Sequence, residues 1–452
     1  MRRKARPGGG KQIEYVIESL GARGDGVSSY DGQPLFTAMT LPGERLRGKV
    51  KGTRNVGLKA DVLELLEESP DRQDPVCEHF GPCGGCTLQH AKPEFYRKWK
   101  RDLVVQSLSR KGFEAEELVG ALVEIPAQTR RRAVFAAEFR GKRARLGFHG
   151  RESHDLVDIR QCHLLAPELM ELVAPLRDLL TVLLAPQGQS GAGAKADITV
   201  NLSDNGADIL LVGKFTLKLE GREAVSAFAQ QNRVARISWI DAGNSRDPKA
   251  RREDPEPLYV GENPVLTFGS VPVTPQPGSF LQPSREGEEA LVSLVLDALP
   301  EDAETIADLY CGCGTFTFPL SKRGRVHAIE GDPGAVAALS SSARRFSTGF
   351  RVTADCRDLA REPVEAEDLE GGDVVVIDPP RAGAKEQCGE LAVSDVPVVV
   401  YVSCNPNAFA RDARILEDGG YRLERVTPVD QFIWSGHVEL VARFIRPEAF
   451  ED

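Results

Sequence analysis

Apolar runs alternate with helical patterns in the C-terminal third of the chain. The runs are rich in valine and isoleucine and end in turn-forming residues, as buried strands do. Buried strands are predicted at residues 305–309, 326–329, 350–353, 373–378 and 397–403. A helical pattern over 285–299 precedes the first of them, and runs at 426–429 and 437–444 predict a closing antiparallel pair. Repeated strand, short loop and helix together predict a parallel, doubly wound α/β sheet.

Short β-type runs fill the N-terminal part of the chain. They are separated by turn-forming sequences such as Arg23-Gly24-Asp25-Gly26, and they lie at residues 14–17, 35–38, 46–50 and 58–66. Some fifty residues of short strands predict a small β-barrel over 12–68. Cations are expected along one edge of this barrel, where they would follow a phosphate backbone. They are Arg45, Arg47, Lys49, Lys51, Arg54 and Lys59.

A helix and a β-rich region are predicted between these two parts. Residues 92–111 are rich in Lys and Arg and have a helical apolar stripe. The stripe is Trp99, Leu103, Val104 and Leu108. Further along, cations at 130–145 interleave with Phe135 and Phe139. This pattern suits phosphate contacts combined with base stacking, although a solvated strand face has a similar pattern.

The length and the polar stretches indicate several domains. A chain of 452 residues has room for two or three cores. Residues 1–11 combine cations with glycine and predict a disordered basic arm, 188–195 predict a loop, and 244–257 a boundary or hairpin tip. No stretch of 18 apolar residues is free of charge, and no apolar segment follows the basic N-terminus. We therefore expect a cytoplasmic monomer that makes no membrane contact.

Charge is distributed unevenly along the chain. The net charge is −10, but residues 1–151 carry +9 and the remainder carries −19. Chance clustering of solvated charges produces such a pattern in some proteins. The asymmetry otherwise indicates a basic front that meets nucleic acid and an acidic body that does not.

The cysteine spacing indicates a metal centre. The chain has nine cysteines, an odd number that argues against a disulfide framework. Cys77, Cys83 and Cys86 follow the spacing C-x5-C-x2-C, and Cys162 is a remote fourth. Four thiolates suit an iron–sulfur cluster or a structural zinc. Three bunched ligands and one remote ligand favour the cluster, because zinc usually takes two C-x2-C pairs.

A glycine loop follows the first predicted strand of the α/β part. Gly312 and Gly314 permit a tight turn and close approach of a ligand, and Glu330 stands where the next strand ends. An acid at that position of a doubly wound sheet can hold a ribose diol. The missing third glycine makes a dinucleotide a poor fit and S-adenosylmethionine a better one. An ordinary turn in an α/β domain remains the alternative.

Three residues near later strand ends indicate covalent chemistry. Asp378 precedes two prolines at one strand end, and Cys404 occupies the equivalent place on the next strand. An ordinary cysteine pKa of ~8.5 leaves a few per cent of nucleophilic thiolate at neutral pH. Burial of Glu439 beside Phe432 and Trp434 would raise its pKa and suit it as a base. Taken singly, Cys404 is equally a small buried residue, and Glu439 a solvent-facing strand carboxylate.

In combination these motifs resemble the TrmA/RumA family of RNA 5-methyluridine methyltransferases, in particular the branch that carries a TRAM domain. The resemblance covers nearly the whole chain and preserves the family's order. It consists of the small barrel, the cysteine set, D-L-Y-C-G-C-G from Asp308, D-P-P-R from Asp378, S-C-N-P from Ser403 and H-V-E from His437.

The resemblance implies a multidomain α/β fold. Residues 12–68 would form a TRAM-like (OB-like) barrel, and 72–91 with 126–262 a central α+β domain that holds the cluster. Residues 92–125 with 274–452 would form a Rossmann-like class I methyltransferase domain.

The resemblance also implies a reaction and its residues. Cys404 would add to uracil C6 and Glu439 would remove the C5 proton. The residues that contact S-adenosylmethionine would be Gln282, Tyr310, Thr315, Glu330, Asp358 and Asp378. The residues that hold a [4Fe–4S] cluster would be Cys77, Cys83, Cys86 and Cys162.

RNA is the implied partner, with large-subunit ribosomal RNA favoured by the TRAM-like barrel and transfer RNA as the alternative. The target base must leave its stack to reach Cys404, and bases in RNA loops are already splayed. Family members often have other residues where Pro283-Ser284, Thr315 and Ile433-Trp434 stand here. Methylation of cytosine or adenine is a second enzymatic reading of D-P-P, and a non-catalytic RNA-binding scaffold is a reading from another class.

Overall fold

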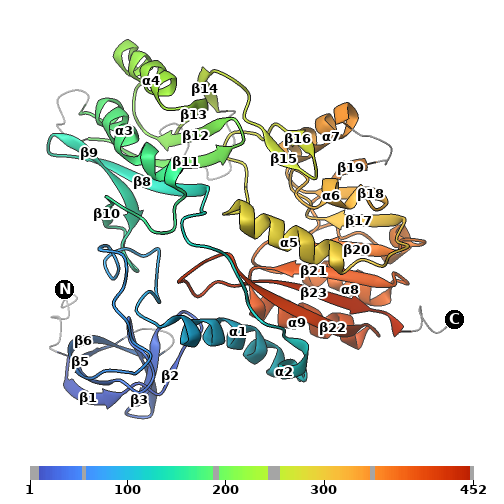
Figure 1. The fold of residues 1–452 in the computed structure, drawn as a ribbon, viewed down its shortest axis with the longest axis horizontal. Helices are drawn as coiled ribbons and strands as arrows, with labels where there is room; N and C mark the ends of the chain where they lie inside the picture. The colour runs from blue at the N-terminus through green and yellow to red at the C-terminus, as the bar shows by residue number, and fades with distance from the viewer. Residues whose placement is uncertain (1–9, 53–56, 187–192, 243–254, 347–351, 448–452) are drawn as a thin grey trace, which may run out of the picture.

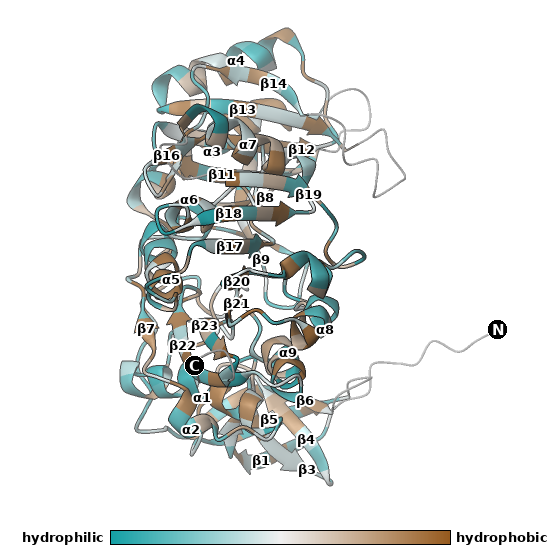
Figure 2. Cartoon of the chain, turned by 90° about the vertical axis from the view of Figure 1, so that its right-hand side faces the viewer, coloured by the Kyte–Doolittle hydropathy of each residue, from teal (hydrophilic) through white to brown (hydrophobic). Residues whose placement is uncertain are grey.

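The computed structural model describes residues 10–52, 57–186, 193–242, 255–346 and 352–447. Nine residues of the predicted basic arm, Arg54, most of the loop predicted at 188–195 and most of the boundary predicted at 244–257 lie outside the described residues. The described strands form three large sheets and one two-stranded sheet. In both views the barrel lies at the opposite end of the molecule from the outermost elements of the central sheet, β14 and α4 (Figure 1, Figure 2).

The N-terminal sheet is a six-stranded, barrel-like layer with the order β1-β5-β6-β4-β3-β2. Its strands are β1 (Gln12–Val16), β2 (Ser19–Leu20), β3 (Gly26–Tyr30), β4 (Gln33–Thr37), β5 (Arg45–Lys51) and β6 (Leu58–Glu67). Tyr15, Ile17, Leu35 and Leu46 fill its small core. The pattern missed β3, because only two of its five residues, Val27 and Tyr30, are large and apolar.

The central sheet has seven strands in the order β10-β9-β8-β11-β12-β13-β14, and its core includes residues of two helices. The strands are β8 (Arg132–Arg140), β9 (Arg143–His149), β10 (Leu156–Asp158), β11 (Lys195–Ser203), β12 (Gly206–Gly213), β13 (Val234–Asp241) and β14 (Glu256–Val260). The helices are α3 (Pro167–Leu183) and α4 (Leu219–Gln231). Phe135 is 1% exposed in this core, so the prediction that its ring stacks on bases is wrong.

The C-terminal sheet has eight strands in the order β19-β18-β17-β20-β21-β23-β22-β7. Its strands are β7 (Val123–Glu124), β17 (Thr305–Leu309), β18 (Arg325–Glu330), β19 (Val352–Cys356), β20 (Val374–Ile377), β21 (Val398–Ser403), β22 (Arg422–Asp430) and β23 (Glu439–Ile445). The strands from β19 to β21 are parallel, and β23 runs antiparallel between β21 and β22. The predicted doubly wound sheet and its closing antiparallel pair are therefore confirmed.

Helices pack on both faces of this sheet (Figure 1). One face carries α1 (Pro93–Ser109), α8 (Lys385–Val393) and α9 (Pro406–Asp418). The core of the other face and edge includes residues of α5 (Arg285–Asp297), α6 (Thr317–Leu320), α7 (Pro333–Phe346) and the hairpin of β15 (Leu266–Phe268) and β16 (Val271–Val273). The remaining short helices are α2 (Ala115–Leu118) and η2 (Ala366–Leu369). Helix α1 comes from the N-terminal third of the chain, yet it packs against α9 and β22.

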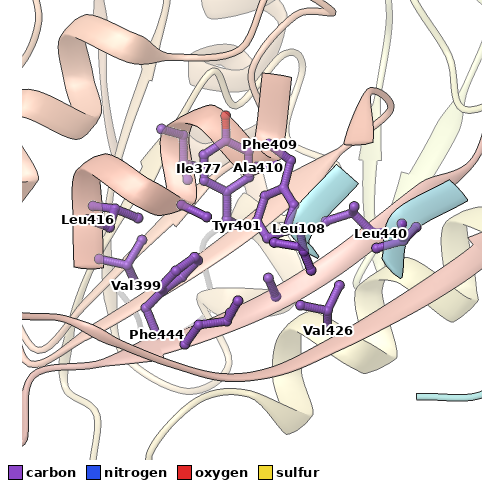
Figure 3. Close-up of a cluster of buried hydrophobic side chains, with 14 of the residues drawn as sticks. Leu108, Ile377, Val399, Tyr401, Phe409, Ala410, Leu416, Val426, Leu440 and Phe444 are labelled. Carbon is purple, nitrogen blue, oxygen red and sulfur yellow. The ribbon is translucent and has the colours of Figure 1, made fainter. Parts of the chain in front are cut away.

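The largest core cluster lies beneath α1, α8 and α9. Tyr401 is fully buried at its centre, and its hydroxyl donates to Asp412 Oδ2 at 2.7 Å (Figure 3). Leu108 from α1 and Phe444 from β23 belong to the same cluster. This packing fixes α1 to the strands whose ends carry Cys404 and Glu439. No helix in the described part of the chain is both long enough and apolar enough to cross a membrane.

Candidate active site

Cys404 and Glu439 lie on neighbouring strands. The antiparallel register of β21 and β23 pairs Ser403 with Leu440, so the next step along each strand places Cys404 opposite Glu439. Glu439 also pairs with Val429 of β22, so it lies in the interior of the sheet. It is 6% exposed, which confirms the predicted burial, whereas Cys404 is only partly covered. The structure thus brings the predicted nucleophile and the predicted base to one place.

Burial and like charges suppress ionisation of both groups. Burial, followed by the negative charge of Asp378, raises the pKa of Glu439 to about 8, while the ammonium of Lys100 acts in the opposite direction. Burial, followed by the charges of Glu439 and Asp378, raises the pKa of Cys404 to about 11. The expectation of an ordinary cysteine pKa is therefore wrong. The thiol is protonated at neutral pH, so its proton must leave before it can attack a base.

The glycine loop and Glu330 form one hydrogen-bonded unit. Glu330 accepts from the backbone N–H of Gly312 at 3.0 Å and from that of Asp332 at 2.8 Å. Gly312 and Gly314 have φ values of 56° and 109°, which glycine adopts without strain. Tyr310 has φ 61°, an uncommon value for a residue with a Cβ. The carboxylate therefore fixes the turn in addition to any contact it makes with a ligand.

Carboxylates gather at the ends of three parallel strands, the neighbours β18 and β19 and, on the other side of β17, β20. Glu330 ends β18, Asp358 follows β19 and Asp378 follows β20. Burial, and then the charge of Glu330, raises the pKa of Asp378 to about 7. Asp358 is more exposed and packs beside Gly331. Carboxylate oxygens at strand ends beside a glycine turn can accept hydrogen bonds from the hydroxyls of a nucleoside, so these residues fit S-adenosylmethionine.

The remaining predicted cofactor residues, Gln282, Tyr310 and Thr315, have different surroundings. Gln282 is buried, and its side-chain oxygen accepts from Gln431 Nε2 at 2.8 Å. Gln431 directly precedes the loop that leads from Phe432 to Glu439. Tyr310 is half-buried, and burial raises its pKa. Thr315 lines a separate cavity between α5 and the β15–β16 hairpin. Thr315 therefore has the weakest geometric link to the other five.

The four predicted ligand cysteines line one cavity of about 230 Å³. The described residues contain no group of three or more His, Cys, Asp or Glu already arranged as a metal site. The thiols nevertheless influence one another's ionisation, since Cys77, Cys83 and Cys162 all contribute to the raised pKa of Cys86, which burial brings to about 12. Arg130 lines the same cavity. Four thiols around one cavity suit a soft metal or a cluster in their chemistry.

The barrel cations form an ion-pair ladder with carboxylates. Arg47 binds Glu14 at 2.8 Å and Glu64 at 2.5 Å, and Arg45 binds Glu67 at 2.7 Å. Two lysines pair in the same way, Lys51 with Asp61 and Lys59 with Glu152. The predicted cations that the structure describes, Arg45, Arg47, Lys49, Lys51 and Lys59, lie along β5 and β6, and the charges of four of them are balanced by neighbouring carboxylates. Their role in binding phosphates remains a prediction.

Comparisons with known proteins indicate RNA methyltransferases. Residues 273–445 match the family model described as tRNA (Uracil-5-)-methyltransferase. An uncharacterized RNA methyltransferase of Brucella suis is 42% identical over 432 residues, which cover 96% of this chain and 97% of that protein. The 23S rRNA (uracil(1939)-C(5))-methyltransferase RlmD of Shewanella woodyi is 32% identical and is covered to 98%, as is this chain.

The chain belongs to the uracil-5 RNA methyltransferase family. It is therefore an S-adenosylmethionine-dependent RNA methyltransferase. The fold agrees with that of the Pyrococcus abyssi tRNA (uracil-54, C5)-methyltransferase in complex with S-adenosyl-L-homocysteine. That structure has a TM-score of 0.74 and 23% identity, and the match covers 96% of this chain and 99% of that one.

The positions that depart from the usual family residues have structural roles here. Ser284 caps α5 by accepting from the backbone N–H of Gly287 at 3.1 Å. Trp434 adopts φ 56°, and its carbonyl accepts from the backbone N–H groups of Thr87 at 2.7 Å and Leu88 at 3.1 Å. The loop before Glu439 is therefore bonded to the segment that follows Cys86.

Sequence reasoning missed the polar groups that support this uracil-5 methyltransferase site. Lys100 has no exposed side-chain surface and forms an ion pair with Asp430 at 2.7 Å. A signal was present, because Lys100 precedes Val104 of the apolar stripe by four residues and so lies on the same helical face. Tyr96 carried the same signal, because it precedes Lys100 by four residues on that face, whereas Gln431 gave none.

Proposed function

We propose that this protein transfers a methyl group from S-adenosylmethionine to C5 of a specific uridine in 23S rRNA. The observation that carries the proposal is the placement of a partly accessible thiol, Cys404, opposite a buried carboxylate, Glu439, at the edge where Asp378 and Glu330 also lie. The relative RlmD, which covers the chain almost completely, supports ribosomal RNA as the substrate. The same reaction on transfer RNA is the alternative.

The two residues divide the reaction between them. Cys404 first gives its thiol proton to water. Its Sγ then bonds to uracil C6, and the electron pair of the C5–C6 double bond moves towards O4, which makes C5 a nucleophile. S-adenosylmethionine, when bound, supplies the methyl group that C5 takes. Glu439 then removes the C5 proton, the C5–C6 double bond re-forms, and the C6–S bond breaks to release Cys404. A nucleophile without a base would remain attached to the RNA.

The other side chains have supporting roles in this proposal. Gln282, Glu330 and Asp378 would orient the methyl donor, with further contacts from Tyr310, Thr315 and Asp358. The electrostatic link between Asp378 and both reacting groups supports a common pocket for donor and base.

Substitution of the nucleophile tests the function. Methyl transfer from labelled S-adenosylmethionine to RNA from a strain that lacks the gene should fall at least about 10⁴-fold in Cys404→Ala. Cys356→Ala is the matched control, because Cys356 is exposed and lies outside the Cys404–Glu439 pair, and it should retain wild-type rates. Undiminished methyl transfer by Cys404→Ala would exclude the covalent mechanism. Mapping 5-methyluridine in ribosomal and transfer RNA of the deletion strain identifies the substrate.

We further propose that Cys77, Cys83, Cys86 and Cys162 hold a [4Fe–4S] cluster. Their shared cavity and soft donor set support a cluster or a zinc ion. Anaerobically purified protein should be brown, with a broad absorption band in the visible region, and should contain about four irons per chain. A colourless protein with one zinc per chain would decide for zinc.

A further inference from the structure

A buried lysine joins the two ends of the loop that precedes Glu439. Lys100 Nζ lies 2.7 Å from Asp430 Oδ1, donates to the carbonyl of Phe432 at 3.1 Å, and also donates to the carbonyl of His437. An ammonium has three hydrogens, and three acceptors surround this one. The contacts with Phe432 and His437 lie at the start and the end of the loop 432–438.

A tyrosine one helical turn earlier reinforces the same loop. Tyr96 lies on the same face of α1 as Lys100 because the two residues are four apart. Its hydroxyl donates to Asp430 Oδ2 at 2.7 Å and accepts from the backbone N–H of Trp434 at 2.7 Å. The two side chains therefore hold Asp430 and the beginning, middle and end of the loop.

Burying the Lys100–Asp430 ion pair costs free energy, which indicates that the pair has a role other than stability. Burial of an ammonium and a carboxylate costs several kcal/mol per ion before their attraction is counted, and apolar residues of similar size often serve stability as well or better. Helix α1 already has a large apolar contact with the sheet through residues such as Leu103, Val104 and Leu108. Anchoring of the helix alone does not require an ion pair at this position.

The pair stands beside the proposed base. Glu439 is two residues beyond the carbonyl of His437 that Lys100 binds. The charged and titratable groups that act on Glu439 or its neighbours come from several elements: Lys100 from α1, Asp378 from the end of β20, and Cys404 from the end of β21. His437 lies in the loop itself, where Lys100, Arg130 and Arg381 influence it. Of the two charged groups that act directly on the pKa of Glu439, Asp378 raises it and Lys100, a cation, lowers it.

We propose that Lys100 is a positioning residue for the reaction, which together with Tyr96 and Asp430 holds the loop 432–438 and so fixes Glu439 opposite Cys404, while its charge favours the carboxylate form of Glu439. This inference rests on the proposed function, because it assigns Lys100 a role towards the base of that reaction. The hydrogen bonds of Lys100 and Tyr96 fix the position of Glu439, and the charge of Lys100 affects the ionisation of Glu439. The two contributions can therefore be separated by substitution.

The test measures release of tritium from RNA that carries [5-³H]uridine, because this signal reports the removal of the C5 hydrogen. Tyr96→Phe removes hydrogen bonds and no charge, so the rate should fall about tenfold or more with the acid limb of its pH profile unmoved. Lys100→Met also removes the charge, so the acid limb should move about one pH unit or more towards alkaline pH. Lys100→Arg restores the charge and should return the limb towards its original position.

Control variants keep the test decisive if Lys100→Met folds poorly. Asp430→Asn removes the carboxylate that keeps buried Lys100 protonated, so Lys100 should lose its charge and the acid limb should move towards alkaline pH, as in Lys100→Met. Arg236→Met breaks another buried ion pair, with Asp208 at 2.7 Å in the central sheet, and should lower stability without moving the limb. Limbs that coincide in Lys100→Met, Asp430→Asn and wild type would overturn the role of the charge.

Failure of the inference is distinct from failure of the proposed function. If the wild-type protein releases no tritium from any RNA of the deletion strain, the proposed function is wrong. If the wild type releases tritium and Tyr96→Phe and Lys100→Met behave like Arg236→Met, the function stands and Lys100 is only a structural residue.

Discussion

Two groups of partly buried thiols in this protein have different neighbours. Burial raises the pKa of Cys404 and also that of Cys77, Cys83 and Cys86. Cys404 faces two carboxylates, Glu439 and Asp378, with Arg381 acting in the opposite direction, whereas the cysteines of the cavity face one another and Arg130. Among Cys77, Cys83 and Cys86, only Cys77 also has a carboxylate, Glu78, acting on it. A thiol beside carboxylates can exchange its proton with them, while several thiols around one cavity exchange their protons for a cation. The neighbours of each thiol, and not its burial, therefore distinguish the proposed nucleophile from the proposed ligand cysteines.

Replacement of the base gives the largest expected effect on the catalytic side of this comparison. Glu439→Gln should slow turnover by about 10²–10⁴-fold, because the C5 proton has no acceptor. Addition by Cys404 needs no C5 proton transfer, so a covalent protein–RNA complex should accumulate and should be visible on a denaturing gel. The double variant with Cys404→Ala should form none. If the single variant Glu439→Gln forms no covalent complex, Glu439 is not the base that removes the C5 proton.

Removal of one cysteine of the cavity should abolish metal binding while the reacting pair keeps its geometry. Cys162→Ser is the preferred change, because Cys162 joins the other three from a distant segment. Metal analysis should give less than about a tenth of the wild-type content, since a site with three thiolates binds far more weakly. Cys388→Ser is the control, because Cys388 is buried in another core. Full metal content in Cys162→Ser would remove it from the ligand set.

The pH dependence of alkylation compares the two kinds of thiol directly. Ionised Glu439 raises the pKa of Cys404, and the pKa of Glu439 itself is about 8. Glu439→Gln should therefore react with iodoacetamide at Cys404 about tenfold faster than wild type at pH near 9.5, with the two rates converging below about pH 7, where Glu439 is protonated. Peptide mass spectrometry measures the rate at each cysteine. The cavity cysteines should show no response to Glu439→Gln.

The smallest expected effect concerns the cation beside the cavity. Arg130 lines the cavity, and its charge also acts on His437 of the loop that precedes Glu439. Arg130→Met should weaken metal binding about tenfold through loss of a neighbouring positive charge, with turnover per metal-loaded chain reduced by less than that factor. Competition with a chelator measures the first and single-turnover assays the second. A larger effect on turnover than on metal would assign Arg130 to the RNA side.

The parallel sheet and the position of the Cys404–Glu439 pair were predictable from sequence for a physical reason. Runs such as 373–378 and 397–403 are buried on both faces, so they read as continuous apolar segments, and the ends of parallel strands meet at one edge. The strand β3 (Gly26–Tyr30) was missed because a barrel strand with one exposed face contains few apolar residues. The pKa of Cys404 was misjudged because neighbours such as Asp378 are brought to it by the fold and not by the sequence.

The ion pairs were beyond sequence reasoning for the same reason. A list of cations on the barrel predicts a basic surface, but the register of β1, β5 and β6 places a carboxylate beside Arg45 and Arg47. Lys100 and Asp430 are 330 residues apart, and only the packing of α1 against β22 makes them neighbours. Periodicity predicts which residues a face contains, and it cannot predict which other face will cover them.

The antiparallel insertion of β23 between two strands has a consequence for how this activity can vary among relatives. Side chains alternate between the faces of a strand, so a shift of one residue in β23 would turn Glu439 away from the thiol and carry Leu440 into its place. Insertions or deletions between residues 431 and 438 are therefore tolerable only if hydrogen bonding along both flanks of β23 is preserved. The register of β23 therefore has to be kept for Glu439 to face Cys404, and the length of the loop before it can change only where that register is unaffected.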